Sequence, residues 1–193
     1  MANQNIKTPR FYTDLISFQM SRGKGQNGNF DVISGTNLIS TFTSGSEAEL
    51  FDLRPHNLCS WDTTVDSGND HIVINIDTGD TNLKHGFLAI LNHNMKSADA
   101  KFRITSSDTE ADIDQENLGG TYITSTEIVN APESSTAVST PTYDGSSIVT
   151  FAEHDRRYIG IQFEGAGDQS GGTGNQFNAS TSLSVGCIMI GEY

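Results

Sequence analysis

The sequence predicts an all-β protein, a jelly-roll β-sandwich preceded by an N-terminal arm. Three observations support this fold class. Ser, Thr, Asn and Gly are abundant, helix-forming residues are scarce, and short apolar runs alternate with polar turns. The 193 residues suffice for one good-sized core, or for one domain plus an arm. Many short strands joined by long polar loops favour a sandwich, for which the jelly-roll is a common topology.

Six segments after residue 70 carry the pattern of β-strands. Alternating side chains would face the core from three of them, and residues 86–92 are apolar on both faces, which is typical of a central strand. The last segment contains glycines, which suit a close approach of two backbones. The predicted strands are 71–77, 86–92, 101–105, 147–152, 157–164 and 183–191.

Residues 1–49 differ in texture from residues 50–193 and are predicted to form an arm that serves assembly. An apolar run precedes a Gly- and Asn-rich stretch, residues 22–29, that would interrupt any regular element. Exposed apolar runs usually find a partner, so this one would dock on a neighbouring subunit or pack across its own domain. Its periodicity fits a helix and a strand equally well. The candidate docking side chains are Phe11, Tyr12, Leu15, Ile16, Phe18 and Met20.

The charge of the chain argues against two classes of partner. Asp and Glu number 24 against 11 Lys and Arg, which gives a net charge of −13. Such a surface repels nucleic acid and anionic lipid. No apolar run has the length of a membrane span. Met1–Asn5 lacks the basic and apolar regions of a signal peptide, so we expect the chain to fold in a cytosol.

The sequence contains no recognisable catalytic or cofactor motif, and we predict that the protein is not an enzyme and has no cofactor. Gly23-x-Gly25-x-x-Gly28 matches a dinucleotide-binding spacing by letter, but no strand precedes it within a βαβ unit. Cys59 and Cys187 form no CxxC pair, which excludes a cysteine-based zinc site. Two buried free thiols are favoured over one long-range disulfide.

The histidines are predicted to be structural. None of the five is paired with another at a spacing of four residues, as a helical metal site would require. His93 ends a predicted strand, where its ring can hydrogen-bond the backbone. The run His154-Asp155-Arg156-Arg157 is interpreted as a turn between two strands, with an arginine pairing to nearby acids.

Several core blocks together resemble a known fold family. They are 70–77, 87–94, 157–163 and 185–193, in that order. They resemble the discoidin-like, or galactose-binding-like, jelly-roll, in which an early Ile- and Asp-containing strand, a later Arg-Tyr strand and an apolar final strand close the sandwich. The blocks are also similar to small virion proteins of tailed, especially marine, bacteriophages. The likeness covers about residues 50–193 and consists mostly of core residues, which indicate fold more than function.

The resemblance implies a structural component of a phage virion, a tail adaptor or fibre-associated protein that contacts other virion proteins and copies of itself. Two alternatives remain open, a module that binds host surface glycan and a capsid decoration protein. The expected location is the virion, after assembly in the host cytoplasm.

Candidate site residues follow from these readings. Sugar-binding members of the family present aromatic side chains at one end of the sandwich, and here Trp61 and Tyr143 are the candidate platforms, although Trp61 also suits the core. Discoidin-like jelly-rolls often hold a structural calcium near early loops, and Asp-rich turns supply the hard oxygens that calcium prefers. The candidate calcium ligands are Asp66, Asp70, Asp77 and Asp80, and the alternative for them is ordinary Asp-Gly turn chemistry.

Overall fold

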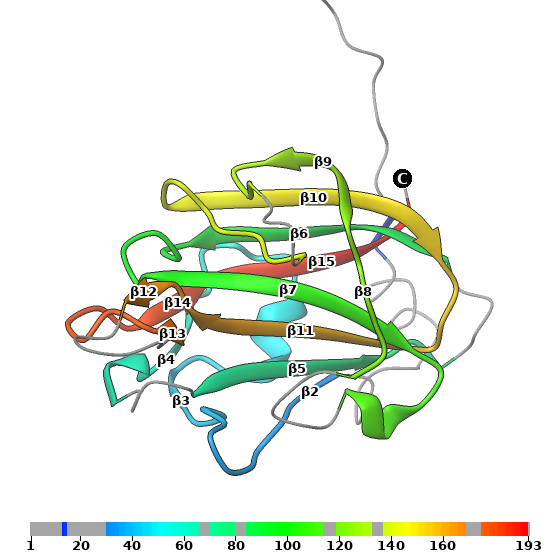
Figure 1. Cartoon of the computed structure of the whole chain (residues 1–193). Helices are drawn as coiled ribbons and strands as arrows, with labels where there is room; N and C mark the ends of the chain where they lie inside the picture. Colours follow the sequence, from blue (N-terminus) through cyan, green and yellow to red (C-terminus); the bar gives the residue numbers. More distant parts are fainter. Residues whose placement is uncertain are drawn as a thin grey trace, which may run out of the picture.

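Two five-stranded antiparallel sheets lie face to face and form a jelly-roll sandwich (Figure 1). The structure, a computed structural model, describes residues 13–14, 30–65, 70–79, 84–113, 119–132, 137–168 and 175–192. In these ranges the only helices are three short 3-10 turns, η1 (Glu47–Phe51), η2 (Thr63–Val65) and η3 (Glu110–Asp112). None of the helices described is long and apolar enough to cross a membrane. The predicted all-β, jelly-roll class is confirmed.

The first sheet has the strand order β1-β15-β6-β10-β9. Its central strand, β6, corresponds to the segment predicted to be apolar on both faces. The strands are β1 (Thr13–Asp14), β15 (Cys187–Glu192), β6 (His85–His93), β10 (Gly145–His154) and β9 (Ser125–Val129).

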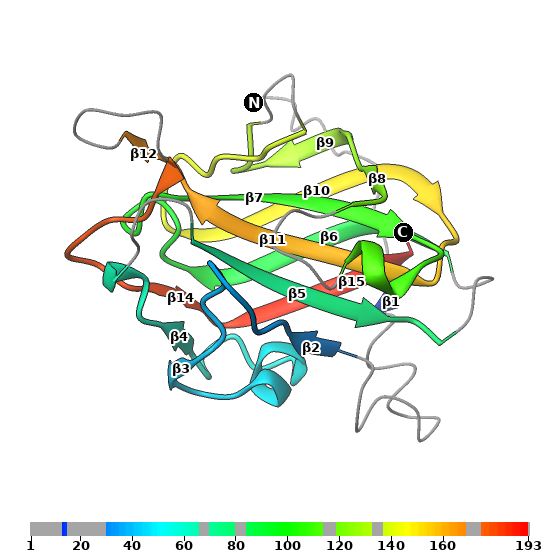
Figure 2. The same ribbon diagram turned by 60° about the horizontal axis from the view of Figure 1, so that its bottom comes forward.

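The second sheet has the order β2-β5-β11-β7-β8, and two smaller sheets, β14-β4-β3 and β12-β13, complete the fold. Figure 2 shows β5 and β11 side by side, with β3, β4 and β14 gathered near one end. The second sheet contains β2 (Phe30–Val32), β5 (His71–Asp77), β11 (Tyr158–Gly165), β7 (Ala100–Ser107) and β8 (Thr121–Tyr122). The smaller sheets contain β14 (Leu183–Val185), β4 (Cys59–Trp61), β3 (Phe42–Ser44), β12 (Gly167–Asp168) and β13 (Asn175–Gln176).

Alternating side chains of the two sheets meet in one apolar core. The register pairs Ile159 of β11 with Ile76 of β5, and Ile161 with Ile74, so these isoleucines share the inner face of the second sheet. The first sheet contributes inward-facing residues of β6, β10 and β15 to the same cluster. The predicted inward set is confirmed, because Ile72, Ile74, Ile76, Phe102, Ile104, Ile159, Ile161 and Phe163 are all buried there.

The final predicted strand, residues 183–191, is divided between two sheets. β14 pairs with β4, whereas β15 pairs with β6, and Gly186 lies between them. A Cβ atom on Gly186 would lie 2.0 Å from the carbonyl oxygen of Pro55. The chain can therefore change sheets here only because the residue has no side chain, which confirms the expected close approach of backbones.

Part of the segment predicted as an arm packs on the sandwich. β1 pairs with the edge of β15, β2 pairs with β5, and the backbone N–H of Val32 donates to Glu47 Oε1 of η1 at 2.9 Å. η1 ends in Phe51, which is buried in the core. The docking residues Phe11, Tyr12, Leu15, Ile16, Phe18 and Met20 lie outside the described residues, and the division of the chain at residue 50 stays a prediction.

Replacing Gly186 with alanine should destabilise the protein by roughly 1–3 kcal/mol, because the new methyl group would overlap the Pro55 carbonyl. Thermal unfolding would show this as a lower Tm. Gly35→Ala is the matched control, because its Cβ would meet only the flexible end of Leu38. Equal Tm values for the two variants would contradict the proposed role of Gly186.

Cys59 and Cys187 are free and buried, and burial raises the pKa of both thiols, that of Cys187 to about 11. We expect neither thiol to react rapidly with a disulfide reagent in the folded protein, and both to react in denaturant. Ala152→Cys, at an exposed position, should add one fast thiol. No reactive thiol in denaturant would instead reveal a disulfide.

Candidate functional site

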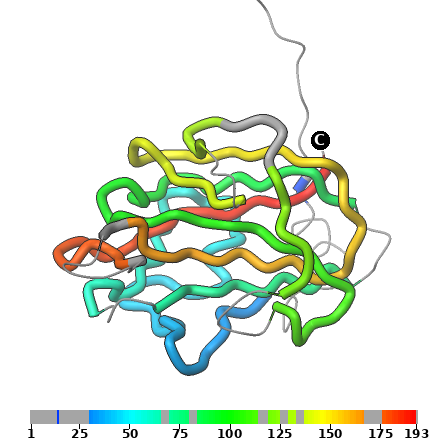
Figure 3. The backbone as a smooth tube through the Cα atoms, in the orientation of Figure 1, coloured from blue at the N-terminus to red at the C-terminus, as the bar shows by residue number. Residues whose placement is uncertain are grey.

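One end of the sandwich, which we call the loop end, carries the connection between β2 and β3, the loops after β4 and β6, and the loop before β10. The register shows that these loops lie at the same end, because Gly145 at the start of β10 pairs with His93 at the end of β6. In the second sheet, His71 at the start of β5 pairs with Glu164 near the end of β11. The loop end comprises residues 37–43, 62–65, 94–99 and 141–144, and Figure 3 traces the connections there.

An open groove of about 480 Å³ lies at this end. One wall is held to the start of β5, because His71 N–H donates to the carbonyl of Asn37 at 2.9 Å and Ile39 N–H donates to that of His71 at 2.8 Å. The turn after β4 supplies the other wall. The lining residues are Asn37, Leu38, Ile39, Ser40, Thr41, Thr43, Asp62, Val65 and Asp70.

The groove combines polar groups with aliphatic surface. Oδ1 of Asp62 accepts hydrogen bonds from the Thr64 backbone N–H at 3.2 Å and from its hydroxyl at 2.5 Å, which orient the carboxylate. Val65 is 67 % exposed. The nine lining residues include two carboxylates and no Lys or Arg. Such a surface can accept hydrogen bonds from hydroxyl or ammonium groups, contact the apolar face of a ligand, and disfavour anions.

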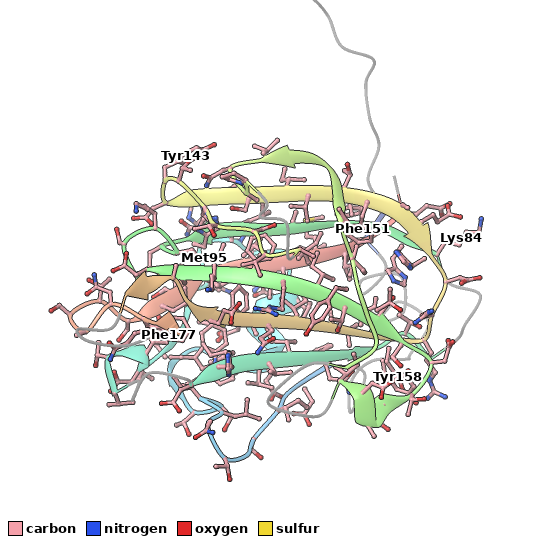
Figure 4. The ribbon with its side chains drawn as sticks, viewed as in Figure 1. Lys84, Met95, Tyr143, Phe151, Tyr158 and Phe177 are labelled. Carbon is pink, nitrogen blue, oxygen red and sulfur yellow. The ribbon has the colours of Figure 1, made fainter. Side chains whose placement is uncertain are left out.

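Tyr143 stands in a second, rigid part of the loop end and is 53 % exposed (Figure 4). The side chain of Asn130 holds this loop. Its amide donates to the carbonyls of Tyr143 at 2.8 Å and Ser146 at 3.2 Å, while its oxygen accepts from the N–H groups of Thr142 at 2.9 Å and Tyr143 at 3.2 Å. An exposed aromatic ring is therefore presented with little conformational freedom left in its backbone.

Asp144 and His93 make further hydrogen bonds beside the loop that carries Tyr143. Asp144 accepts hydrogen bonds from the backbone N–H of Ser97 at 2.9 Å and from its hydroxyl. Ser147 donates to the carbonyl of Asn130 at 2.7 Å, so its hydroxyl accepts from Nε2 of His93 at 2.8 Å. Nδ1 of His93 accepts from the Met95 N–H at 3.2 Å, which confirms the predicted backbone bond.

The protonation of His93 follows from this arrangement. Burial lowers its pKa to about 4, although the charge of Asp144 acts in the opposite direction. A neutral ring satisfies both hydrogen bonds, because one nitrogen donates and the other accepts. A proton on Nδ1 would break the bond to the Met95 N–H, which belongs to the loop 94–99.

The outer face of the second sheet contains a buried ionic cluster, in which basic side chains surround the carboxylate of Glu164. Glu164 is 2 % exposed and pairs with Arg103, with His71 at 3.6 Å and with Lys101 at 3.9 Å. Burial acts to raise the pKa of Glu164, but hydrogen bonds from His71 and Arg103 and the charge of Arg103 hold it below its usual value. We interpret this cluster as structural, since its carboxylate is already surrounded.

Trp61, a predicted sugar platform, belongs to the core. Its side chain is fully buried, and its ring centroid lies 4.9 Å from that of Phe42 and 6.4 Å from that of Phe163. On β4 it alternates with Ser60, and Cys59 and Trp61 face inward. The expectation of sugar contact at Trp61 is therefore wrong for this conformation, whereas Tyr143 is exposed as such a contact requires.

The candidate calcium ligands do not form one site. Asp70 and Asp77 flank opposite ends of β5, roughly 20 Å apart at the usual rise per residue. Asp77 instead binds Arg157 through two hydrogen bonds of 2.7 Å. The prediction that an arginine of the run 154–157 pairs with an acidic residue is therefore confirmed. Asp66 and Asp80 lie outside the described residues. Within those residues no group of three or more His, Cys, Asp or Glu side chains is placed to hold a metal.

Most of the groove was not recognisable in the sequence. Residues 37–43 fall within the predicted arm, and no motif marks them. Asp70 was singled out, but as a calcium ligand. Asn130 follows β9, a strand that the sequence did not indicate, and its bonding to a loop twelve residues or more away is visible only in the folded chain.

Comparisons with known proteins show the fold. No family model matches the chain, and no curated protein matches it. Among solved structures, chitosan-binding module 1 of a chitosanase/glucanase from Paenibacillus sp. IK-5 is similar, with a TM-score of 0.55 and 13 % identity over 94 % of this chain and 100 % of that one. A selenomethionine-labelled variant of that module gives 0.51 and 14 % over the same shares. The expected discoidin-like jelly-roll is thus supported as a fold.

Acidification should destabilise the protein through His93. Its folded-state pKa of about 4 lies below the ordinary 6.5, so its contribution is complete above pH 6.5 and is lost as the pH falls to about 4. The difference corresponds to about 3 kcal/mol at most. Chemical denaturation at several pH values measures it.

His93→Gln should reduce this pH dependence, because glutamine keeps an amide donor without titrating. His56→Gln, at an exposed position, is the substitution with which it is compared. Burial also lowers the pKa of His154, which therefore contributes to the pH dependence of stability in every variant. The contribution of His93 is measured by the difference in this pH dependence between the two variants. Identical slopes in both variants would contradict the assignment.

Proposed function

We propose that this protein is a carbohydrate-binding module without catalytic activity, and that it binds glycan in the groove at the loop end. The observation that carries the proposal is the composition of the groove, which is lined by Asp62, Asp70, several hydroxyl groups and the exposed side chain of Val65. Sugars present hydroxyl groups at their edges and C–H groups on their faces, which match such a surface. The fold is consistent with this role, since a structural neighbour is named as a chitosan-binding module.

Charge narrows the class of glycan. The groove has two carboxylates, and the whole chain carries a net charge of −13. Anionic polysaccharides would be repelled, whereas neutral sugars and sugars bearing amines would not. We therefore propose neutral or amine-bearing glycans, for example on a host cell surface, and not nucleic acid.

Tyr143 offers a further contact on the other side of the loop end. Its ring is exposed and its backbone is held by Asn130. Aromatic rings at binding surfaces supply large contact areas at low entropic cost. A long oligosaccharide that crosses the loop end would meet both the groove and this ring.

Calorimetric titration with glucosamine oligomers, their N-acetylated counterparts and uronate oligomers tests the proposal. We expect binding of one or both of the first two and none of the third. Asp62→Asn should weaken binding of the amine-bearing oligomer about tenfold, the equivalent of about 1.4 kcal/mol, because it removes a charged acceptor. Asp70→Asn should act in the same direction.

Asp155→Asn is the matched control, because it removes the same charge from an exposed turn at the opposite end. Non-specific attraction by net charge would weaken equally in Asp62→Asn and Asp155→Asn, and that result would contradict a site in the groove. Tyr143→Ala should reduce affinity for long oligomers more than for short ones. Failure of every glycan to bind would overturn the proposed function.

A structural role in a phage virion, as a tail, fibre or capsid-surface component, is our second proposal. It is favoured by Leu53 and Leu58, which are 45 % and 44 % exposed on the turn between η1 and β4, because exposed apolar side chains in one turn suit a protein contact. The structural neighbours do not bear on this role. Light scattering of the full chain distinguishes a defined oligomer from a monomer.

A further inference from the structure

The outer face of the first sheet carries an unbroken apolar row across four strands. The register aligns Met189 of β15 with Ala89 of β6, Ala89 with Ile148 of β10, and Ile148 with Val129 of β9. Residues directly opposite each other in antiparallel strands share a face, so these four side chains lie side by side. The solvent face of a sandwich normally carries polar residues at such positions.

A shallow groove of about 200 Å³ follows this row. Its five lining residues are all apolar, and they come from β6, β10 and β15. Phe87 of β6, which lines the groove, is 1 % exposed, whereas Val129 at the β9 end of the row is 53 % exposed. The sheet edge beyond β15 is occupied by β1 (Figure 2).

β1 places the apolar N-terminal segment beside this groove. Asp14 pairs with Gly191, and Gly191 pairs with Phe87, so the three residues form one row on the outer face. Gly191, between Asp14 and Phe87 in this row, has no side chain. Continued by two residues, the same register would set position 16 opposite Met189. Position 16 is an isoleucine.

We propose that the apolar segment Leu15–Met20 of the same chain docks on this outer groove, with Ile16 beside Met189. The proposal goes beyond glycan binding and assigns a role to the predicted docking residues. Two arguments favour the chain's own segment over a second copy. β1 tethers the segment one strand away, which gives it a high effective concentration. A second copy brings another −13 charges, which repel.

Cysteine cross-linking in the full chain tests this docking. Ile16→Cys combined with Met189→Cys should form a disulfide within one chain under mild oxidation, seen by peptide mapping and by an unchanged monomer mass. Ile16→Cys with Val129→Cys is the matched control, because three strand spacings, about 14 Å, separate Val129 from Met189. This control pair should stay reduced.

Other outcomes overturn the proposal. A disulfide-linked dimer from the Ile16 and Met189 pair would show that the segment docks on a second copy. A disulfide in neither pair, or in both at equal rates, would show that the segment does not dock at Met189.

A second measurement avoids dependence on disulfide geometry. Met189→Cys alone should react slowly with a maleimide, and adding Ile16→Asp should accelerate the reaction, because a charged side chain would not stay in an apolar groove. The parent protein supplies the background from Cys59 and Cys187. Circular dichroism verifies that both variants are folded. Equal labelling rates in the two variants would contradict the docking.

Discussion

Apolar packing between the two sheets is the interaction on which the rest of the structure depends. β11 pairs along its length with β5 on one side and with β7 on the other, so its inward residues occupy the middle of the core. Because side chains alternate, fixing Ile159, Ile161 and Phe163 inward also fixes the opposite set outward. Glu164 is thereby directed away from the core, where the charges of Arg103 and Lys101 neutralise it and His71 contacts it. A shift of one residue would bury that carboxylate among isoleucines.

The same rule explains which features of the fold could be predicted from the sequence. Isoleucines alternating in residues 71–77 and 157–164 indicate strands whatever surrounds them, because side chains two residues apart share one face of a strand. β2, β3 and β9 lack that signal. Phe30–Val32 is three residues long and forms a strand because β5 offers an edge to pair with. The break at Gly186 also depends on a distant residue, Pro55, which no local pattern reveals.

The candidate site was less predictable than the fold, because its residues come from segments far apart in the chain. Tyr143 was recognisable as an aromatic residue in a polar loop. The same reasoning also selected Trp61, whose side chain is buried in the core. The difference lies in their neighbours. Trp61 belongs to a strand whose inner face meets Phe42 and Phe163, whereas Tyr143 belongs to a loop fastened by Asn130. Neither set of contacts can be predicted from the residues next to Trp61 or Tyr143 in the sequence.

The direction of the strands gives the molecule two unlike ends. β15 begins at the loop end, where Cys187 pairs with Leu91, and runs to Glu192 at the opposite end, where β1 also lies. A partner or surface attached near β1 or Glu192 would therefore be separated from the groove and Tyr143 by the length of a strand. A protein attached in this way would direct its groove away from the attachment point. Many copies attached side by side would form an array in which all grooves face the same direction.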